Sequence, residues 1–215
     1  LTIFHLMGQH VNYKLRYRKE QAKFWASSYE EKRPELTTAQ RKMLSHYDNA
    51  TLYNDSIVTQ IVKRFQKENA IVIYVPDHGE ECYEEDRGFI CRNHAANIDW
   101  PLAHYEFEIP FWIYCSPKYI KTHRDIYRQI RAAKDKRFMT DALPHLLLYL
   151  AGIETPTYKE EYNILSPKYN EMRPRILKNS ADYDQLRDEH LKKVEKEKRK
   201  KEKRKKEKSK KGDKK

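Results

Sequence analysis

Apolar runs and polar breaks along the chain predict an alternation of strands and helices. Residues 70–75 and residues 109–115 are short apolar runs, typical of buried strands. The first of these runs is apolar on both faces, as in parallel strands that are covered by helices. Residues 2–7 form a third short apolar run, which also predicts a buried strand.

Helical spacing of apolar residues predicts the elements between these strands. Thr37 or Thr38 can cap a long helix that runs to about residue 67. One buried stripe recurs along this helix, at Tyr47, Ala50, Ile57, Ile61 and Phe65. Residues 124–133 predict a short charged helix, and residues 140–153 predict an apolar helix capped by Thr140. This order of elements is that of an α/β protein with a parallel or mixed sheet.

Two long polar stretches interrupt the predicted elements. Residues 8–36 are rich in tyrosine and arginine and contain a proline, so we expect a loop over the surface. Residues 77–107 show no clear periodicity and contain histidine, asparagine, tryptophan and carboxylates. A connection of this length inside a compact domain is usually functional or disordered. Its composition favours a functional loop.

The positive charge of the chain belongs to its last residues. The 215 residues make one domain or part of one, and their net charge is +12. Residues 192–215 contain 16 lysines and arginines against 5 acidic residues, whereas residues 1–191 contain 28 against 27. The fold itself is therefore close to neutral, which does not indicate a nucleic-acid surface.

We expect a folded part over residues 1–178 and a charged, lysine-rich tail over residues 179–215. The tail has no apolar face, so it is expected to be a frayed helix or disordered. One interpretation is a solvated terminus. The other is electrostatic attachment to a phosphate-rich partner, such as anionic lipid headgroups, lipopolysaccharide or RNA.

No apolar run approaches the roughly 20 residues of a membrane span, and no signal peptide is visible. The first residue is Leu1, in what reads as the middle of a strand, so we expect that sequence precedes it. The three cysteines lack the spacing of a zinc site and are expected to be free thiols. Cys82 and Cys91 could pair in an oxidising compartment.

Candidate chemistry lies where two predicted strands end. The first strand runs into Gly8, Gln9 and His10, and residues 70–75 run into Asp77, His78 and Gly79. In α/β sheets, ligands bind outside the carboxyl ends of the strands. A turn allowed by the glycine would let Asp77 and His78 converge, and a carboxylate oxygen and an imidazole nitrogen both suit Zn²⁺.

His94 and His104, in the long loop that follows, strengthen the hypothesis of a metal-assisted phosphoryl or sulfuryl site. Any single histidine can instead be a surface or hydrogen-bonded residue. That interpretation is favoured for His104, as it is for His46, His123, His145 and His190. Asp48 and Asp55 are expected to cap, pair or face solvent rather than to bind metal.

Four motifs stand out, which in chain order read "FHLMGQHVNYKLRY", "YDNATLYNDSIV", "IVIYVPDHGEE" and "YEFEIPFWIYCSPKY". They resemble those of the phosphoethanolamine transferases, in the sulfatase-like branch of the alkaline phosphatase superfamily, and the resemblance spans residues 2–163. It implies a three-layer α/β/α sandwich of the alkaline phosphatase/sulfatase type, of which this chain is the C-terminal portion. The tail lies outside the resemblance.

By this resemblance, Asp77 and His78 are the pair that binds the catalytic Zn²⁺. His10 and His94 are the histidines that contact the phosphoethanolamine group or a second metal. Around His94 the sequence "FICRNH" departs from the tyrosine-leucine-histidine-glycine pattern of the family. The family's threonine nucleophile has no match here, because Thr37, Thr38 and Thr51 fall in or near a helix.

The resemblance also implies a reaction and a location. The expected activity is zinc-dependent transfer of phosphoethanolamine from phosphatidylethanolamine to lipid A or to a core sugar of lipopolysaccharide, without a specific nucleic-acid partner. The enzyme would sit in the bacterial inner membrane through N-terminal helices that are missing here, with its catalytic domain in the periplasm. One alternative is a sulfatase or phosphodiesterase-type hydrolase. Another is a non-catalytic fragment whose basic tail binds anionic partners.

Overall fold

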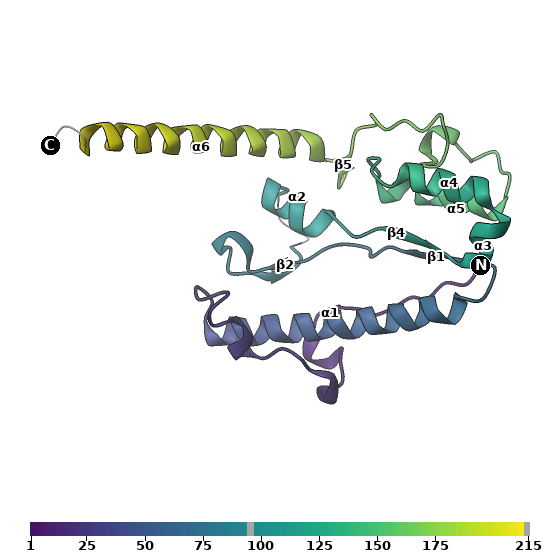
Figure 1. Cartoon of the computed structure of the whole chain (residues 1–215), viewed down its shortest axis with the longest axis horizontal. Helices are drawn as coiled ribbons and strands as arrows, with labels where there is room; N and C mark the ends of the chain where they lie inside the picture. The colour runs from purple at the N-terminus through teal and green to yellow at the C-terminus, as the bar shows by residue number, and fades with distance from the viewer. Residues whose placement is uncertain (94–96, 213–215) are drawn as a thin grey trace. The chain divides into compact units, whose positions relative to one another are not determined.

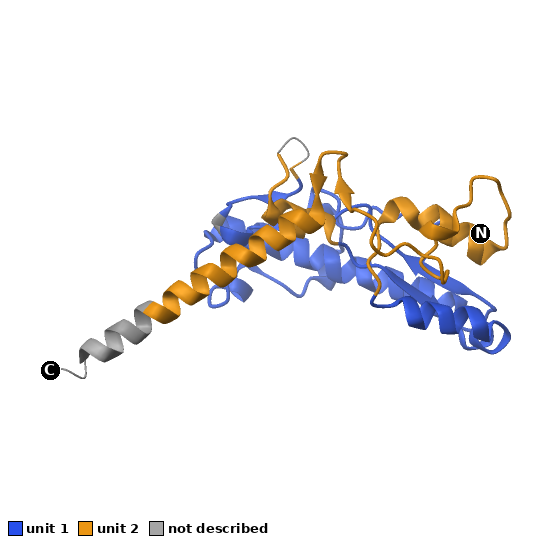
Figure 2. Cartoon of the chain, turned by 90° about the horizontal axis from the view of Figure 1, so that it is seen from above, with its two compact units in different colours: residues 1–92, 109–135 blue, residues 93–108, 136–215 orange. Residues whose placement is uncertain are grey.

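A computed structural model of the chain describes residues 1–93 and 97–212. The chain divides into two compact units (Figure 2). Unit 1 comprises Leu1–Arg92 and Ile109–Asp135, and unit 2 comprises Asn93–Glu108 and Lys136–Lys215. The expected boundary between residues 178 and 179 stays a prediction.

The long helix of unit 1, α1 (Thr38–Phe65), begins as the sequence predicts. The Thr37 side chain accepts a hydrogen bond from the Gln40 backbone amide, and the Gln40 side-chain oxygen accepts one from the Thr37 backbone amide. This reciprocal pair satisfies two amides that the first turn leaves free. In Figure 1, α1 runs along the ribbon formed by β1 and β4.

The strands of that ribbon differ from the prediction. β1 (Ile71–Tyr74) and β4 (Trp112–Cys115) pair antiparallel, with Ile71 opposite Cys115 and Tyr74 opposite Trp112. The rings of Tyr74 and Trp112 stack at 5.2 Å. All four residues of β1 are half-buried. The expectation of a parallel strand buried on both faces is therefore wrong for this pair, because one antiparallel neighbour leaves the other edge of β1 unpaired within the described residues.

The first apolar run does not form a strand. Residues 2–7 have no hydrogen-bonded strand partner among the described residues, and most of their side chains are exposed. Residues 8–36 form a surface segment with three short 3-10 turns, η1 (Tyr13–Leu15), η2 (Lys19–Gln21) and η3 (Ala26–Tyr29). The surface loop predicted over residues 8–36 is confirmed, whereas the prediction of a strand over residues 2–7 is wrong.

The remaining elements of unit 1 include a small hairpin and two helices. The hairpin pairs β2 (Glu81–Cys82) with β3 (Ile90–Cys91) around the turn η4 (Glu84–Asp86). The helix α3 (Pro117–Thr122) precedes α4 (Arg124–Ala133), which coincides with its predicted range. A core of Tyr29, Leu36, Leu44, Cys82 and Tyr83 joins the surface segment and α1 to the hairpin. The three cysteines are free thiols, as expected.

Unit 2 is built from helices and one small hairpin. Its elements are α2 (Trp100–Phe107), η5 (Thr140–Ala142), α5 (Leu143–Ala151), η6 (Glu160–Tyr162), β5 (Ile176–Leu177), β6 (Ala181–Asp182) and α6 (Tyr183–Gly212). The helix α2 interrupts the loop expected over residues 77–107. Most of the predicted tail is helical, because α6 covers it from Tyr183 to Gly212. A core of Ala103, Leu177 and Tyr183 joins α2, the hairpin and the first turn of α6.

The apolar helix α5 ends as its sequence requires. Gly152, its C-cap, has φ +65°, a left-handed conformation that costs a glycine little. Pro144 lies in the first turn, where the missing amide would be free anyway. Thr140, expected to be the cap, instead opens the short turn η5 before the helix, so that expectation is wrong by one turn.

Candidate functional site

The Asp77–His78 pair follows the end of β1 in unit 1. Val75 and Pro76 close the strand, and the chain then turns irregularly. His78 Nε2 lies 3.7 Å from Asp77 Oδ2, and Arg92 Nη1 lies 4.0 Å from the same oxygen. The Asp77 side chain is 86% exposed, whereas that of His78 is 23% exposed. The expected convergence of these two side chains is thus present.

The orientation of the His78 ring is fixed by its own loop. His78 Nδ1 lies 2.7 Å from the carbonyl oxygen of Gly79. A carbonyl oxygen only accepts, so Nδ1 carries the proton and Nε2 keeps its lone pair. Histidines that bind metals commonly donate their second N–H to a backbone carbonyl in this way. The side of His78 that faces Asp77 is therefore the side that can bind a metal ion.

Glu80, two residues further on, is the half-buried acid of this loop. The Tyr13 hydroxyl donates to Glu80 Oε2 at 3.0 Å, and Cys91 Sγ lies 3.9 Å from Oε1. Burial raises the pKa of Glu80, while the Tyr13 hydrogen bond and the nearby His78, Arg92 and His10 side chains act against that rise. His10 and His78, from the two expected site segments, thus both influence this carboxyl group.

The turn that carries His10 is tied to α1. Gly8 has φ +47° and lies beside Asn54, and the Gln9 side-chain amide donates to the Thr51 hydroxyl at 3.2 Å. His10 itself is exposed, and its carbonyl accepts from Arg16 Nε at 3.0 Å. The backbone of the "MGQH" turn is thus held, while the imidazole stays accessible.

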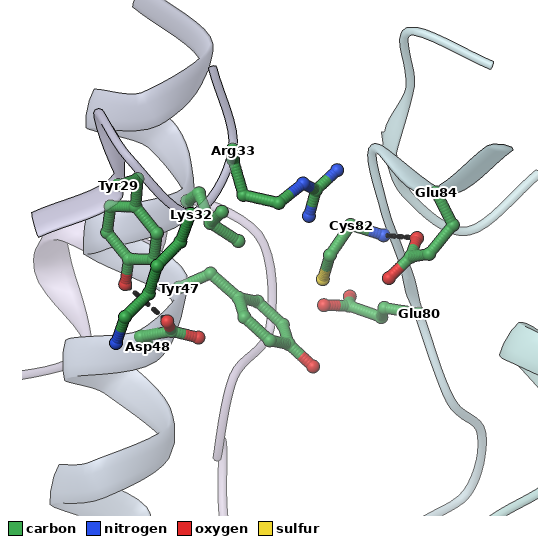
Figure 3. Close-up of a pocket in the computed structure, with 9 residues that line it drawn as sticks. Tyr29, Lys32, Arg33, Tyr47, Asp48, Glu80, Cys82 and Glu84 are labelled. Atoms are coloured by element: carbon green, nitrogen blue, oxygen red, sulfur yellow. Dashed lines mark hydrogen bonds between the residues drawn. The ribbon is translucent and has the colours of Figure 1, made fainter. Parts of the chain in front are cut away.

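Glu80 also lines a pocket of about 470 Å³ (Figure 3). Its lining includes three acids, Asp48, Glu80 and Glu84, with Tyr47 between them and Arg33 nearby. The Asp48 carboxylate accepts a hydrogen bond from the Tyr29 hydroxyl, so its expected structural role is confirmed. Asp55 is exposed, as expected.

His94 and His104 were the other two histidines that the sequence offered for this site. His94 lies outside the described residues, so its role stays a prediction. His104 is on α2 in unit 2, where its Nδ1 lies 2.9 Å from Glu108 Oε1. The histidines expected to be structural each contact a neighbour: His46 the Tyr17 hydroxyl, His123 the Thr122 hydroxyl, His145 the Lys159 amide and His190 the Trp100 ring.

Three threonines and one cysteine of unit 1 have structural contacts, and the expectation that the chain lacks the nucleophile stays a prediction. Thr37 caps α1, and the Thr51 hydroxyl donates to the carbonyl of Tyr47 at 3.0 Å. The Thr38 hydroxyl accepts from Arg41. Burial raises the pKa of the Cys82 thiol, which therefore stays protonated and weakly nucleophilic.

Asp77 and His78 fit a zinc ion as two of its ligands. Two ligands about 2.0–2.1 Å from one tetrahedral ion lie about 3.4 Å apart, close to the 3.7 Å seen here. A zinc site in proteins takes three or four protein ligands. No cluster of three or more histidine, cysteine, aspartate or glutamate side chains that could hold a metal is found in residues 1–93 and 97–212. The pair supplies only two of these ligands, so its role in a zinc site stays a prediction.

Sequence reasoning missed the residues that surround the pair. Glu80 was visible as the first of two acids after the "DHG" turn, but nothing local distinguished it from Glu81. Glu81 is instead fully buried, with its carboxylate 2.7 Å from Arg87 Nε. Tyr13 and Arg92 carried no signal beyond their residue types, because their contacts depend on the fold.

Comparisons with known proteins agree with the resemblance. The sulfatase family model matches residues 1–153. Phosphoethanolamine transferase EptC of Escherichia coli O18:K1:H7 (strain RS218 / NMEC) is 33% identical over 194 residues, which cover 86% of this chain and 32% of the relative. The Kdo(2)-lipid A phosphoethanolamine 7''-transferase of Escherichia coli K12 is 29% identical over 140 residues, 64% of this chain and 23% of the relative.

Solved structures of similar sequence have the same fold. The C-terminal periplasmic domain of EptC from Escherichia coli superimposes with a TM-score of 0.68 and 30% identity, over 85% of this chain and 51% of that chain. A zinc complex of that domain gives a TM-score of 0.66 and 29% identity, over 83% of this chain and 50% of that chain. This likeness confirms the α/β fold of the alkaline phosphatase/sulfatase type.

The chain spans about a third of the length of the curated relatives it matches and about half of the solved domains. The four motifs and the fold indicate the same family. The chain belongs to the sulfatase family, and within that family it resembles the phosphoethanolamine transferases.

Proposed function

We propose that this protein takes part in zinc-dependent transfer of phosphoethanolamine from phosphatidylethanolamine to lipid A or to a core sugar of lipopolysaccharide. The observation that carries the proposal is the orientation of His78. Its Nδ1–H is given to the Gly79 carbonyl, which leaves Nε2 free beside the exposed carboxylate of Asp77. The curated relatives are phosphoethanolamine transferases, one of them named for lipid A, and one similar domain was solved with zinc.

Asp77 and His78 would hold the zinc ion. When bound, zinc would stabilise the negative charge that develops on a transferred phosphoryl group. His10 and His94 would hold the phosphoethanolamine group and exchange protons with it. The Tyr13 hydrogen bond keeps the Glu80 carboxylate at a fixed place beside His78 and His10. The attacking threonine of the family would come from sequence outside the motifs matched here.

The proposed location follows the relatives. The similar solved domains are periplasmic, and we place this protein in the periplasm at the bacterial inner membrane. Among the helices of residues 1–93 and 97–212, none has both the length and the apolar content needed to cross a membrane. Attachment to the membrane through further helices therefore belongs to the proposal.

Zinc binding by the chain joined to the remaining part of a related catalytic domain tests the metal site without requiring turnover. We expect Asp77→Ala and His78→Ala each to weaken zinc binding more than about 100-fold in calorimetric titration, beyond the effect of losing an outer partner. Asp55→Ala removes an exposed carboxylate of the same unit and serves as the matched control. Unchanged zinc affinity in both site variants would refute the assignment.

Transfer itself is tested with the chain joined to the missing part of a related catalytic domain. The expected result is a lipid A or core-sugar product that carries phosphoethanolamine and is absent with Asp77→Ala. Release of free phosphoethanolamine without an acceptor product would instead assign a hydrolase.

A further inference from the structure

The last helix, α6, carries most of the net positive charge of the chain, and its described side chains from residue 191 onward are exposed. Residues 192–215 contain 16 basic and 5 acidic residues, and Val194 is the last apolar side chain before the chain ends. The side chains of residues 191–203 are all exposed. An α-helix with this composition gains nothing from the core, so its charge is available to a partner.

The start of α6 is fixed to the rest of unit 2. Tyr183 is buried, the Arg175 guanidinium lies 4.3 Å above its ring, and its hydroxyl donates to Glu108. The carboxylate of Asp184 accepts from Arg175 Nη2 at 2.6 Å. About two turns into the helix, the His190 ring stacks on Trp100 at 5.3 Å. These contacts limit rotation of the helix about its own axis.

One face of the exposed part of α6 is uniformly basic. With 3.6 residues per turn, positions spaced four and three residues apart fall on one stripe. The residues at this spacing are all cationic: Lys192, Lys196, Arg199 and Lys203. We call these four positions the basic stripe. From first to last they span about 17 Å of helix at 1.5 Å per residue.

The acidic residues of α6 lie beside the basic stripe rather than on it. Glu195 and Glu202 are seven residues apart and share an edge of their own. Glu195 forms an ion pair with Arg199 at 2.5 Å, but both side chains are more than 60% exposed. Exposed pairs of this kind hold little energy and do not block a stronger partner. The stripe therefore remains a continuous row of cations.

The chemistry of the stripe favours a lipid surface over a nucleic acid. No phenylalanine, tyrosine or tryptophan occurs from residue 184 to residue 215, so the helix has no ring on which bases could stack. It has no apolar face to insert between acyl chains either. A row of lysines and arginines without either feature matches the headgroup phosphates at the surface of an anionic bilayer.

We propose that the basic stripe of α6 docks this protein on the anionic phospholipid surface of a bilayer. The choice of a membrane as the partner rests on the proposed function, whose donor and acceptor are lipids. Because the base of α6 is fixed to unit 2, the same face of the helix meets the membrane each time. Docking would hold unit 2 close to the surface where lipid substrates lie.

Vesicle co-sedimentation of the 215-residue chain tests the docking surface without any turnover. The probe is a vesicle of phosphatidylcholine with phosphatidylglycerol, compared with phosphatidylcholine alone, at roughly 0.1 M and 1 M salt. The stripe variant replaces four cations of the stripe with glutamine, at Lys192, Lys196, Arg199 and Lys203. The matched control replaces four cations elsewhere on the same helix, at Lys193, Lys198, Lys200 and Lys201. Lysine, arginine and glutamine have similar helix propensities, so both variants keep α6 helical.

We expect binding to the anionic vesicles alone, with release at the higher salt concentration. Each lysine or arginine near such a surface contributes about a 5-fold factor in affinity. The stripe variant should therefore bind more than about 100-fold more weakly, and the control variant less than about 10-fold more weakly. Equal loss in the two variants, binding to neutral vesicles, or preference for RNA over anionic vesicles would overturn the proposal. Because binding is measured alone, a failed transfer assay would not imply a failed docking assay.

Discussion

The hydrogen bond from Tyr13 to Glu80 joins the turn before α1 to the loop after β1, and its removal can be measured. Tyr13→Phe deletes the hydroxyl that lies 3.0 Å from Glu80 Oε2. The ring of Tyr13 is only 3% exposed and meets the ring of Tyr47 edge-on at 5.2 Å, and phenylalanine keeps that contact. The substitution therefore removes the polar contacts of one hydroxyl, with Glu80 and with the nearby Cys91 thiol, and little packing.

The expected cost depends on the charge of Glu80. A buried hydrogen bond to an ionised group contributes about 1.5–3 kcal/mol to stability, and a neutral one about 0.5–1.5 kcal/mol. Burial raises the folded pKa of Glu80 above its usual 4.5, so its carboxyl group stabilises the fold most below that pH and less as pH rises through the folded pKa. Tyr13 opposes this rise, and its loss raises the pKa of Glu80 further. Tyr13→Phe should thus cost about 1 kcal/mol more near pH 8 than near pH 4.

Urea unfolding, followed by tryptophan fluorescence, measures this difference in a double-mutant cycle of Tyr13→Phe and Glu80→Gln. We expect a coupling energy of at least about 1 kcal/mol near pH 8. Tyr53→Phe is the matched control, since the Tyr53 side chain is half-buried and its hydroxyl has no hydrogen-bond partner among the described residues. A coupling energy under about 0.3 kcal/mol, or a cost that does not change with pH, would refute the reasoning.

Three further outcomes are expected. In a catalytically complete domain, His10→Ala and His94→Ala should each slow transfer about 100-fold in a discontinuous assay while zinc remains bound; loss of zinc would make that residue a ligand. Asp184→Asn should lower the free energy of unfolding by about 2 kcal/mol at neutral pH. The hydrogen bond from Arg175 lowers the pKa of Asp184. The difference in unfolding free energy between the variant and the original chain should therefore vanish as pH falls below 3.8 through the folded pKa. A difference that stays constant with pH would contradict this cause. The 215-residue chain by itself should show no transfer from phosphatidylethanolamine with excess zinc, and turnover that disappears with Asp77→Ala would contradict this.

The start of α1 and the end of α5 were predictable from local signals. The capping box at Thr37 and Gln40 and the left-handed Gly152 act within one turn, so the sequence alone locates those ends. The helix α2 was missed although Asp99 caps it and a proline lies in its first turn. Both signals were visible, but the surrounding loop residues hid a helix of only 8 residues.

Strands were less predictable, because a strand is defined by a partner far away in the sequence. Residues 2–7 have the composition of a strand but no partner among the described residues. The apolar run that became β1 suggested parallel neighbours on both sides, whereas its described partner β4 is antiparallel. Composition measures how well a residue fits a pleated surface, and it does not select the neighbour.

The sequence by itself determined which residue types meet at the end of β1. Asp77 and His78 are adjacent in the chain, so any turn there brings a carboxylate and an imidazole together. Only the tertiary structure decided that the Tyr13 hydroxyl donates to Glu80 across 67 residues and that Glu80 is half-buried beside the pair. Side-chain direction and burial arise from long-range packing, and burial is what raises the pKa of Glu80. Local sequence supplies the chemical groups, and the fold sets their distances, their protons and their exposure to water.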